Sequence, residues 1–475
     1  MSGPADHPTI SNSFLFQNGE DSVLKITMMA DAAHIIKNIR NQLYNNKIFI
    51  LPDDFVQQHG LVTNVVDIGC IKDLLDFKRE KELDLAPHLP DDILNLTQFK
   101  KMDVGLAVKL LSRDTAAAIR TLVAKHGRSK RYLATAAFFQ ESGFYYDIVS
   151  SRSSKFCFHK NAPETNAKRI EFLKSFMNLY SRMKLSDKQK DGLKPTQLGV
   201  LLTTTSLIEL QEDLLNEGAV FFLPGRTLQD SLESFQGNMR RINSNPTPLQ
   251  FMRNAKRMSI GQILSKVRGS SYGEDDSTEF LTELKNIKVL EDHENEDQLD
   301  IENFNDMKWE PSDFFEEMAL SNLGGYLLAH TIGPRGPSKC STCAEAFILK
   351  ADAEWLEVNF HIREKEYKEG SLTRPSKIFY EMIFKAESLF RCNRDSLMEQ
   401  KNITIKMRNI FVGVLTKEFN DIPLCCLQLI FTRFSKIRLH FYGKHLNGKL
   451  QKANKKKIQD DANASKTTKR KVTVK

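Results

Sequence analysis

Two acidic side chains that could bind a metal ion stand three positions apart in GRTLQDSLESF, residues 225–235. If this stretch is a helix, Asp230 and Glu233 lie one turn apart on the same face. Mg²⁺ prefers hard oxygen ligands and usually takes one or two protein carboxylates at each ion. The pair therefore has two interpretations, a solvated helix face or half of a metal site.

A third acid, Asp31, stands between two stretches with different patterns. The apolar and β-branched content of SVLKITMMAD predicts a strand at 22–31. The next stretch, AAHIIKNIRNQLYNN, predicts an amphipathic helix at 32–46, with Lys37 and Arg40 off its apolar stripe. The predicted stripe consists of Ile35, Ile36, Ile39 and Leu43.

The position of Asp31 also has two interpretations. Catalytic carboxylates of α/β sheets lie where a strand ends, but an aspartate directly before a helix commonly caps that helix. Phosphoryl chemistry with two metals needs carboxylates from distant parts of the chain around ions about 3.5–4 Å apart. An aspartate at a strand end and an acid from a later helix, such as Asp31 and Glu233, would form one such assembly.

The cysteines point to a reducing compartment, because seven of them are scattered without the pattern of a disulfide framework. Only two pairs fall close together in the sequence, Cys340 with Cys343 and Cys425 with Cys426. The spacing of Cys340 and Cys343 is that of half a zinc site, and a pair of reduced thiols is the alternative. The nearby candidates for further zinc ligands are His330, His361 and Cys392.

The composition is that of a globular protein with a mild excess of positive charge. The chain has 475 residues, 41% hydrophobic and 27% charged, with a formal net charge of +8. This charge fits a polyanionic partner or ordinary solubilising charge. Basic runs at 455–457 and 469–471 are typical of nuclear localisation or nucleic-acid contact, and a solvated tail is the alternative. No apolar stretch approaches the roughly 18 residues of a membrane helix, so we expect no membrane partner.

Several stretches together resemble P-element-type transposases, a family that includes the THAP-domain transposase relatives of animals. DAAHIIKNIRNQL (31–43) looks like the family's Asp-x-x-His-x-x-Lys-x-x-Arg-Asn segment. LQDSLESFQGNMRRINSNPTPLQF (228–251) resembles its Gln-Asp-x-x-Glu helix and the turn after it. ESGFYYDIVSSRS (141–153) resembles the end of its helical insertion, with Val149 where asparagine is expected. Further similar stretches are 100–119, 324–343 and 433–447.

The resemblance implies an α/β plus α fold. A ribonuclease-H-like core is interrupted by a helical GTP-binding-type insertion and followed by a mainly helical C-terminal region. The implied domains are 1–46, the incomplete N-terminal part of the core; 47–165, the insertion; 166–265, the C-terminal part of the core; 266–311, an acidic linker; 312–447, the helical C-terminal domain; and 448–475, a basic disordered tail.

The resemblance also implies Mg²⁺-dependent DNA strand cleavage and transfer in the nucleus, with GTP as a cofactor. The expected partners are DNA at transposon ends, GTP and further copies of the chain in a homo-oligomer. Active members hold the metal with two aspartates and one glutamate. The second aspartate corresponds to Asp31 and the glutamate to Glu233, both as catalytic residues and metal ligands. Asp230 corresponds to an aspartate near the nucleotide.

One departure from the family bears on activity. The family's first catalytic aspartate lies on an earlier strand, whereas only 30 residues precede Asp31. Three strands and their turns need roughly 50 residues or more. We therefore expect an N-terminally shortened member that lacks this aspartate. Two hypotheses follow, a DNA transposase or a remnant of one, and a catalytically inactive transposon-derived protein that binds nucleic acid or a partner.

Overall fold

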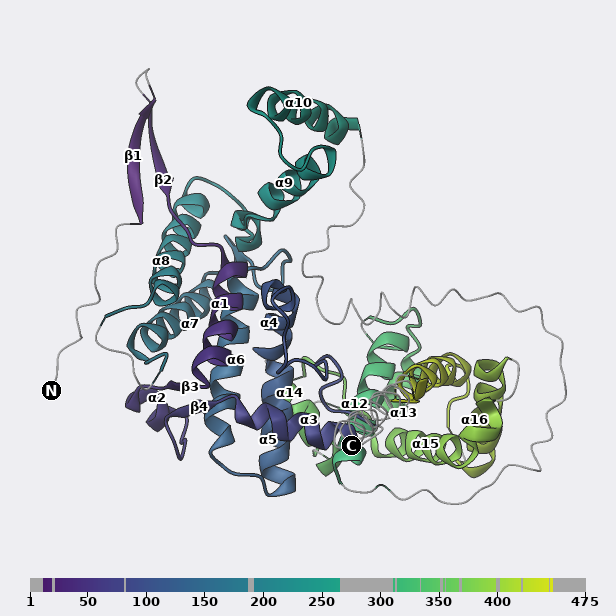
Figure 1. Cartoon of the computed structure of the whole chain (residues 1–475). Coiled ribbons are helices and arrows are strands. Elements are labelled where there is room, and N and C mark those ends of the chain that lie inside the picture. The colour runs from purple at the N-terminus through teal and green to yellow at the C-terminus, as the bar shows by residue number, and fades with distance from the viewer. Residues whose placement is uncertain are drawn as a thin grey trace, which may run out of the picture. The chain divides into compact units, whose positions relative to one another are not determined.

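The computed structural model is mostly helical, with three two-stranded sheets among the residues that it describes (Figure 1). These residues form two compact units. The first takes in the described residues within 1–73, 88–123 and 127–292, and the second takes in those within 74–87, 124–126 and 293–475. The described residues are 12–18, 22–80, 83–186, 192–264, 311, 314–333, 335–350, 353–354, 356–366, 370–398, 402–419, 422–443 and 445–446.

The first unit begins with an antiparallel hairpin of strands β1 (Ser13–Asn18) and β2 (Ser22–Thr27). The strand predicted at 22–31 is therefore too long by four residues. After one backbone bond from Met28 N–H to the Asn12 carbonyl at 2.7 Å, the backbone beyond Thr27 bonds to side chains of α8. The Met28 carbonyl accepts a hydrogen bond from Ser206 at 2.6 Å, and Ala30 exchanges two hydrogen bonds with the Thr203 hydroxyl at 2.7 and 2.9 Å.

Helix α1 (Ala32–Asn46) has the bounds that its periodicity predicts, and all four residues of the predicted apolar stripe are buried. The placement of Arg40 outside that stripe was wrong, because Arg40 is fully buried. Its guanidinium donates to the backbone carbonyl of Asp103 at 2.9 Å and to that of Lys101. Buried charge needs such partners, and these bonds tie α1 to the segment before α4 (Val104–Leu110).

Further helices of the first unit pack around a core with many aromatic side chains. Tyr145 on α6 stacks on Phe176 of α7 with ring centroids 4.4 Å apart, and Phe49 meets Phe138 edge to face at 5.6 Å. These helices are α2 (Asp53–Gln58), α6 (Tyr132–Val149), α7 (Pro163–Arg182) and α8 (Pro195–Asn216), together with α3 (Gly69–Glu80) up to residue 73 and α5 (Arg113–His126) up to residue 123.

Two short sheets complete this unit. Strands β3 (Ile48–Ile50) and β4 (Val65–Asp67) pair antiparallel, as do β5 (Phe158–His159) and β6 (Phe221–Phe222). The second pairing brings the chain after α6 alongside the chain that leads to α9. From β6 the chain continues into a 3₁₀ turn, η2, and then into the last two described helices of the unit. Their bounds are Pro224–Thr227 for η2, Asp230–Ile242 for α9 and Pro248–Leu264 for α10.

A close backbone approach fixes the start of this last segment. The N–H of Gly225 donates to the Ser151 carbonyl at 2.8 Å, and a Cβ atom at Gly225 would lie 2.4 Å from the Ser150 carbonyl oxygen. Only glycine fits at this distance. The contact holds η2, and so the entry to α9, against the end of α6.

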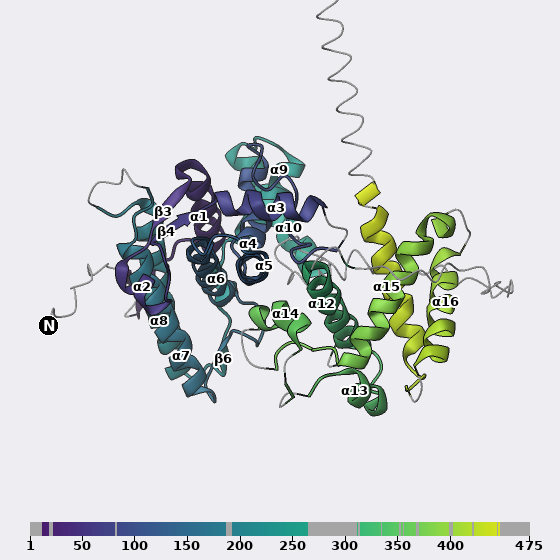
Figure 2. The ribbon, with the colours of Figure 1, turned by 90° about the horizontal axis from the view of Figure 1, so that it is seen from below.

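The second unit is helical, and its longest helices lie side by side (Figure 2). Glu387 on α15 is fully buried, and its carboxylate accepts hydrogen bonds from Arg438 at 2.6 and 2.7 Å and from Arg391 at 2.7 Å. The helices are α12 (Phe314–Thr331), α13 (Ser341–Phe347), α14 (Phe360–Lys365), α15 (Lys377–Met398), α16 (Ile403–Glu418) and a segment at 427–443, with a 3₁₀ turn, η4, at Glu357–Asn359.

The helical part of the predicted fold class is confirmed, while the ribonuclease-H-like core and the domain boundaries stay predictions. None of the described helices is both long and apolar enough to span a membrane. The predicted acidic linker at 266–311, apart from residue 311, and the predicted tail at 448–475 lie outside the described residues.

Candidate functional site

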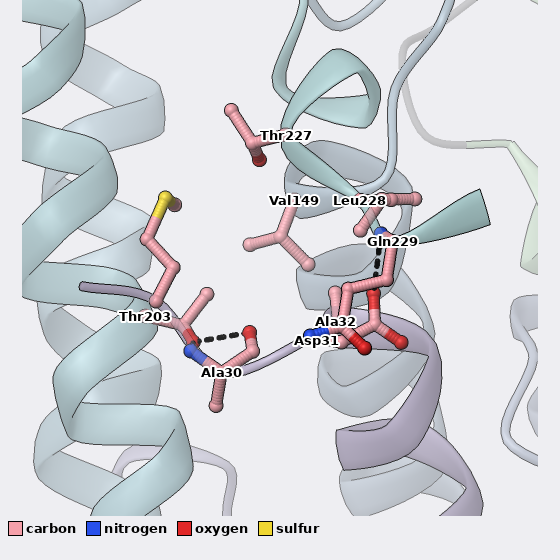
Figure 3. Close-up of a pocket in the computed structure, with 9 residues that line it drawn as sticks. Ala30, Asp31, Ala32, Val149, Thr203, Thr227, Leu228 and Gln229 are labelled. Atoms are coloured by element: carbon pink, nitrogen blue, oxygen red, sulfur yellow. Dashed lines mark hydrogen bonds between the residues drawn. The ribbon is translucent and has the colours of Figure 1, made fainter. Parts of the chain in front are cut away.

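Asp31 is a buried carboxylate held by two backbone N–H groups. Its Oδ2 accepts from His34 N at 3.2 Å, which is the N-cap bond of α1, and its Oδ1 accepts from Gln229 N at 3.4 Å. The side chain is 3% exposed. Figure 3 shows the carboxylate directed at Gln229, which lies 198 positions later in the sequence. The capping interpretation of Asp31 is thus confirmed, and the carboxylate also contacts the segment that carries Glu233. The catalytic role of Asp31 stays a prediction.

His34 stands between Asp31 and Glu233. Its Nδ1 lies 3.6 Å from Oδ2 of Asp31, and its Nε2 lies 3.5 Å from Oε1 of Glu233. The Glu233 side chain is 37% exposed, so it is far more open to solvent than Asp31. The structure therefore brings the two predicted catalytic acids to opposite sides of one imidazole, which comes from α1.

Asp230 points to a different partner from Glu233, although the two are one turn apart on α9. Its carboxylate forms an ion pair with Arg152, which follows the C-terminal end of α6. Asp230 is 14% exposed at its side chain and begins α9, where a negative charge also favours the helix dipole. Arg152 was not singled out as a functional residue from the sequence, although it lies in the 141–153 stretch that resembles the family.

A small cavity of about 60 Å³ opens beside Asp31. Val149 lines it where the family resemblance predicts asparagine, so this wall is apolar (Figure 3). The other lining residues are Met29, Ala30, Ala32, Thr203, Thr227, Leu228 and Gln229.

A larger open pocket of about 550 Å³ lies along the outer face of α1. Lys37, Asn41 and Asn45 line it from α1, at i, i+4 and i+8 on one helix face. Phe99, 89% exposed, and Lys101 line it from the segment before α4. This combination of lysines, amides and an exposed aromatic ring can bind a phosphate-bearing ring compound. The sequence signal was present in the spacing on α1, but it needs the fold to bring Phe99 beside it.

The cysteine pair predicted as half a zinc site lies beside a second pair of cysteines in the structure. Cys340, Cys343, Cys425 and Cys426 place their sulfur atoms within 4.8 Å of one another. Among the described residues, this is the group in which three or more possible metal-ligand atoms lie close together. None of the nearby candidates named from the sequence, His330, His361 and Cys392, belongs to this group.

Comparisons with known proteins agree with the motifs. Residues 33–163 match the family model described as "TNP-like, GTP-binding insertion domain". The chain is 24% identical over 462 residues to the "Transposable element P transposase" of Drosophila melanogaster, which covers 93% of this chain and 55% of that protein. The resemblance to P-element-type transposases is thereby confirmed, and the chain spans about half the length of this curated relative.

A solved structure is also similar in part. It is the "Drosophila P element transposase strand transfer complex", at 24% identity and a TM-score of 0.44, covering 52% of this chain and 54% of that chain.

Proposed function

We propose that this chain acts as a P-element-like DNA transposase, or is a remnant of one, with Mg²⁺-dependent DNA strand cleavage and transfer as its chemistry. The observation that carries the proposal is the assembly of Asp31, His34 and Glu233. Two contacts join the start of α1 to the start of α9, from Gln229 N to Asp31 at 3.4 Å and from His34 to Glu233 at 3.5 Å. Asp31 and Gln229 are 198 positions apart in the sequence. Carboxylates brought together from distant parts of a chain are what metal-dependent phosphoryl transfer needs. The similarity to the Drosophila transposase supports the same class.

The proposed metal ion is magnesium, which would be held by the carboxylates of Asp31 and Glu233 on either side of His34. Asp31 and Glu233 offer hard carboxylate oxygens, and two backbone N–H groups fix the orientation of Asp31. The imidazole of His34 lies between these acids, so it has to turn aside or join the ligand set when an ion binds. A bound ion would supply activation of the attacking oxygen and stabilisation of the leaving oxygen. The chain's own contribution is to hold Asp31 rigid and to leave Glu233 partly exposed toward solvent and substrate.

The proposed architecture places this site in a ribonuclease-H-like core formed by 1–46 and 166–265, with the helical insertion at 47–165 between the two parts. The helical domain at 312–447 follows. Similarity of residues 33–163 to a GTP-binding insertion domain supports the insertion.

GTP is the proposed nucleotide, and the open pocket on α1 is the proposed place for it. Lys37 and Lys101 would hold phosphate oxygens, the amides of Asn41 and Asn45 would donate to the nucleotide, and the exposed ring of Phe99 would stack on the base. Asp230, the cofactor-binding residue predicted from the family helix, is not among the residues that line this pocket. Its ion pair with Arg152 holds it in place at the start of α9.

DNA is the proposed macromolecular partner, at transposon ends, and the nucleus is the proposed compartment. The formal net charge of +8 supports a polyanionic partner. Contacts from lysine and arginine to phosphates release counterions, so binding should weaken as salt rises. Assembly of several copies on DNA is proposed as well.

The test is nicking and joining of supercoiled plasmid DNA with Mg²⁺ and GTP, compared between the wild-type chain and Glu233→Gln. Glu217→Gln is the matched control, because Glu217 is an exposed glutamate at the end of α8. We expect Glu233→Gln to lower the rate at least about 100-fold, the scale for removal of a group that acts in the reaction. The control should keep the wild-type rate. Salt-dependent DNA binding by a wild-type chain that never cuts would instead support the inactive, nucleic-acid-binding alternative.

A further inference from the structure

Four cysteines from two distant segments of the second unit form one cluster. The Sγ of Cys425 lies 3.3 Å from that of Cys340 and 3.2 Å from that of Cys343. All four sulfurs, including that of Cys426, lie within 4.8 Å of one another, and all four cysteines are free of disulfides. Cysteines 82 residues apart in the sequence are thus held at ligand spacing by the fold.

We propose that Cys340, Cys343, Cys425 and Cys426 bind one Zn²⁺ ion in a closed structural site. Zinc–thiolate bonds are about 2.3 Å long, so a tetrahedral four-thiolate site separates its sulfurs by about 3.8 Å. The sulfur separations of 3.2 and 3.3 Å and the 4.8 Å limit for the whole group bracket this value. Small rotations of the cysteine side chains bring all four to the same centre.

Local structure on both segments supports the site. Cys340 is the N-cap residue of α13, and Cys343 lies one turn later, so a C-x-x-C spacing at a helix start directs both sulfurs to one side. Cys425 and Cys426 stand in the turn before the helical segment 427–443. Both segments therefore present their thiols from turns that lead into helices.

A neighbouring hydroxyl group contacts one of the four sulfur atoms. The Ser338 hydroxyl lies 3.3 Å from the Cys426 sulfur, and the backbone N–H of Ser338 donates to the Thr331 carbonyl at 3.0 Å. Hydrogen bonds to ligand sulfurs hold them in place and tune their charge, as the outer partners of metal ligands generally do.

Soft thiolate ligands in tetrahedral arrangement select zinc or iron–sulfur centres among the common metals. A cluster with several irons would push its cysteine sulfurs much farther apart than the observed contacts. A single ion fits the spacing. The ion would join α13 to the 422–443 segment, and its binding free energy would then stabilise the folded second unit. The site is separate from Asp31 and Glu233, so it does not rest on the proposed transposase chemistry.

Zinc content of the purified full chain tests this proposal, measured by mass spectrometry of the metal after gel filtration in reducing buffer. We expect one zinc per chain in the wild type and at least a tenfold lower content in Cys343→Ser and in Cys425→Ser. Cys425 is exposed, so its variant keeps the test valid if Cys343→Ser fails to fold. Cys392→Ser is the matched control from the same unit, and it should keep the full zinc content.

Cobalt provides a second readout. Replacing zinc by Co²⁺ should give the strong visible absorption of a tetrahedral thiolate site in the wild type and in Cys392→Ser, with that absorption lost in Cys425→Ser. Wild-type protein without zinc, zinc retained in both ligand variants, or a disulfide among these four cysteines in protein kept reduced would each overturn the proposal.

Discussion

Oδ1 of Asp31 accepts a hydrogen bond from the backbone N–H of Gln229 at 3.4 Å, although the two residues are 198 positions apart. This bond joins the first turn of α1 to the residue that precedes α9. Glu233 follows one turn into α9, and His34 contacts both acids. The two predicted catalytic carboxylates therefore lie on either side of His34, and Asp31 also holds the residue that precedes the helix of Glu233.

Substitutions at Asp31 should separate its two roles. Asp31→Asn keeps a side-chain oxygen for the N-cap bond to His34, so we expect a small loss of stability. Asp31→Ala removes the cap and should cost about 1 kcal/mol more in the free energy of unfolding. Both variants should lose Mn²⁺ binding to the same extent, because each removes the charge. Urea unfolding followed by circular dichroism measures the first effect, and metal titration the second. Wild-type metal affinity in Asp31→Asn would contradict the ligand role.

Two glycine substitutions should change stability in opposite directions. A Cβ atom at Gly225 would meet the Ser150 carbonyl at 2.4 Å, so Gly225→Ala forces the backbone apart and should destabilise the first unit by about 1–3 kcal/mol. Gly237 lies inside α9, where an added methyl group would meet nothing within 4 Å, so Gly237→Ala should stabilise the helix by about 0.5–1 kcal/mol. Thermal unfolding of both variants measures the contrast. Equal effects would mean that η2 does not pack against the end of α6 as described.

The buried carboxylate of Glu387 should be essential to the second unit. Glu387→Gln removes the negative charge that pairs with buried Arg438, and breaking such a pair costs about 3–5 kcal/mol. The matched control is Glu418→Gln, which removes a partly exposed ion pair to Lys385 at 3.2 Å. Exposed pairs contribute about 1 kcal/mol or less. Chemical unfolding of both variants measures the loss in the free energy of unfolding. A smaller loss in Glu387→Gln than in Glu418→Gln would contradict this prediction.

The same residue predicts a pH dependence. Burial alone would raise the pKa of Glu387, but the charges of Arg438 and Arg391 outweigh it and hold this pKa below the usual 4.5. A depressed pKa in the folded state contributes stability above the unfolded value and loses it as pH falls through the folded value. The stability difference between wild type and Glu387→Gln should therefore be full at pH 7 and shrink below pH 4.5. Urea unfolding of both proteins across this range measures it, and a difference that grows on acidification would contradict the sign.

Helix α1 shows how much of the fold follows from local sequence. Its bounds and its apolar stripe were predicted correctly, because a 3.6-residue periodicity and a capping aspartate determine a helix without help from distant residues. Arg40 was misplaced for the opposite reason. Its buried guanidinium is compensated by carbonyls of Lys101 and Asp103, 61 and 63 residues away, and no local pattern carries that information.

Some features of the candidate sites also follow from local sequence, whereas others depend on packing between distant segments. The spacing from Asp31 to His34 and from Asp230 to Glu233 could be read locally, and family resemblance linked the two segments. The ion pair of Asp230 with Arg152 and the joining of Cys343 to Cys425 depend on packing between segments far apart in the chain. Cys425 was visible in the sequence as half of an adjacent pair, but only the fold shows which thiols it meets.

Mn²⁺ binding to the full chain, followed by electron paramagnetic resonance, tests the central claim that Asp31 and Glu233 form a metal site. We expect the wild type and Glu217→Gln to bind Mn²⁺ equally. Glu233→Gln should bind at least about tenfold more weakly, because losing a ligand costs no less than losing one of its outer partners. Binding by Glu233→Gln that matches the wild type, or a wild-type chain that does not bind the ion, would contradict it.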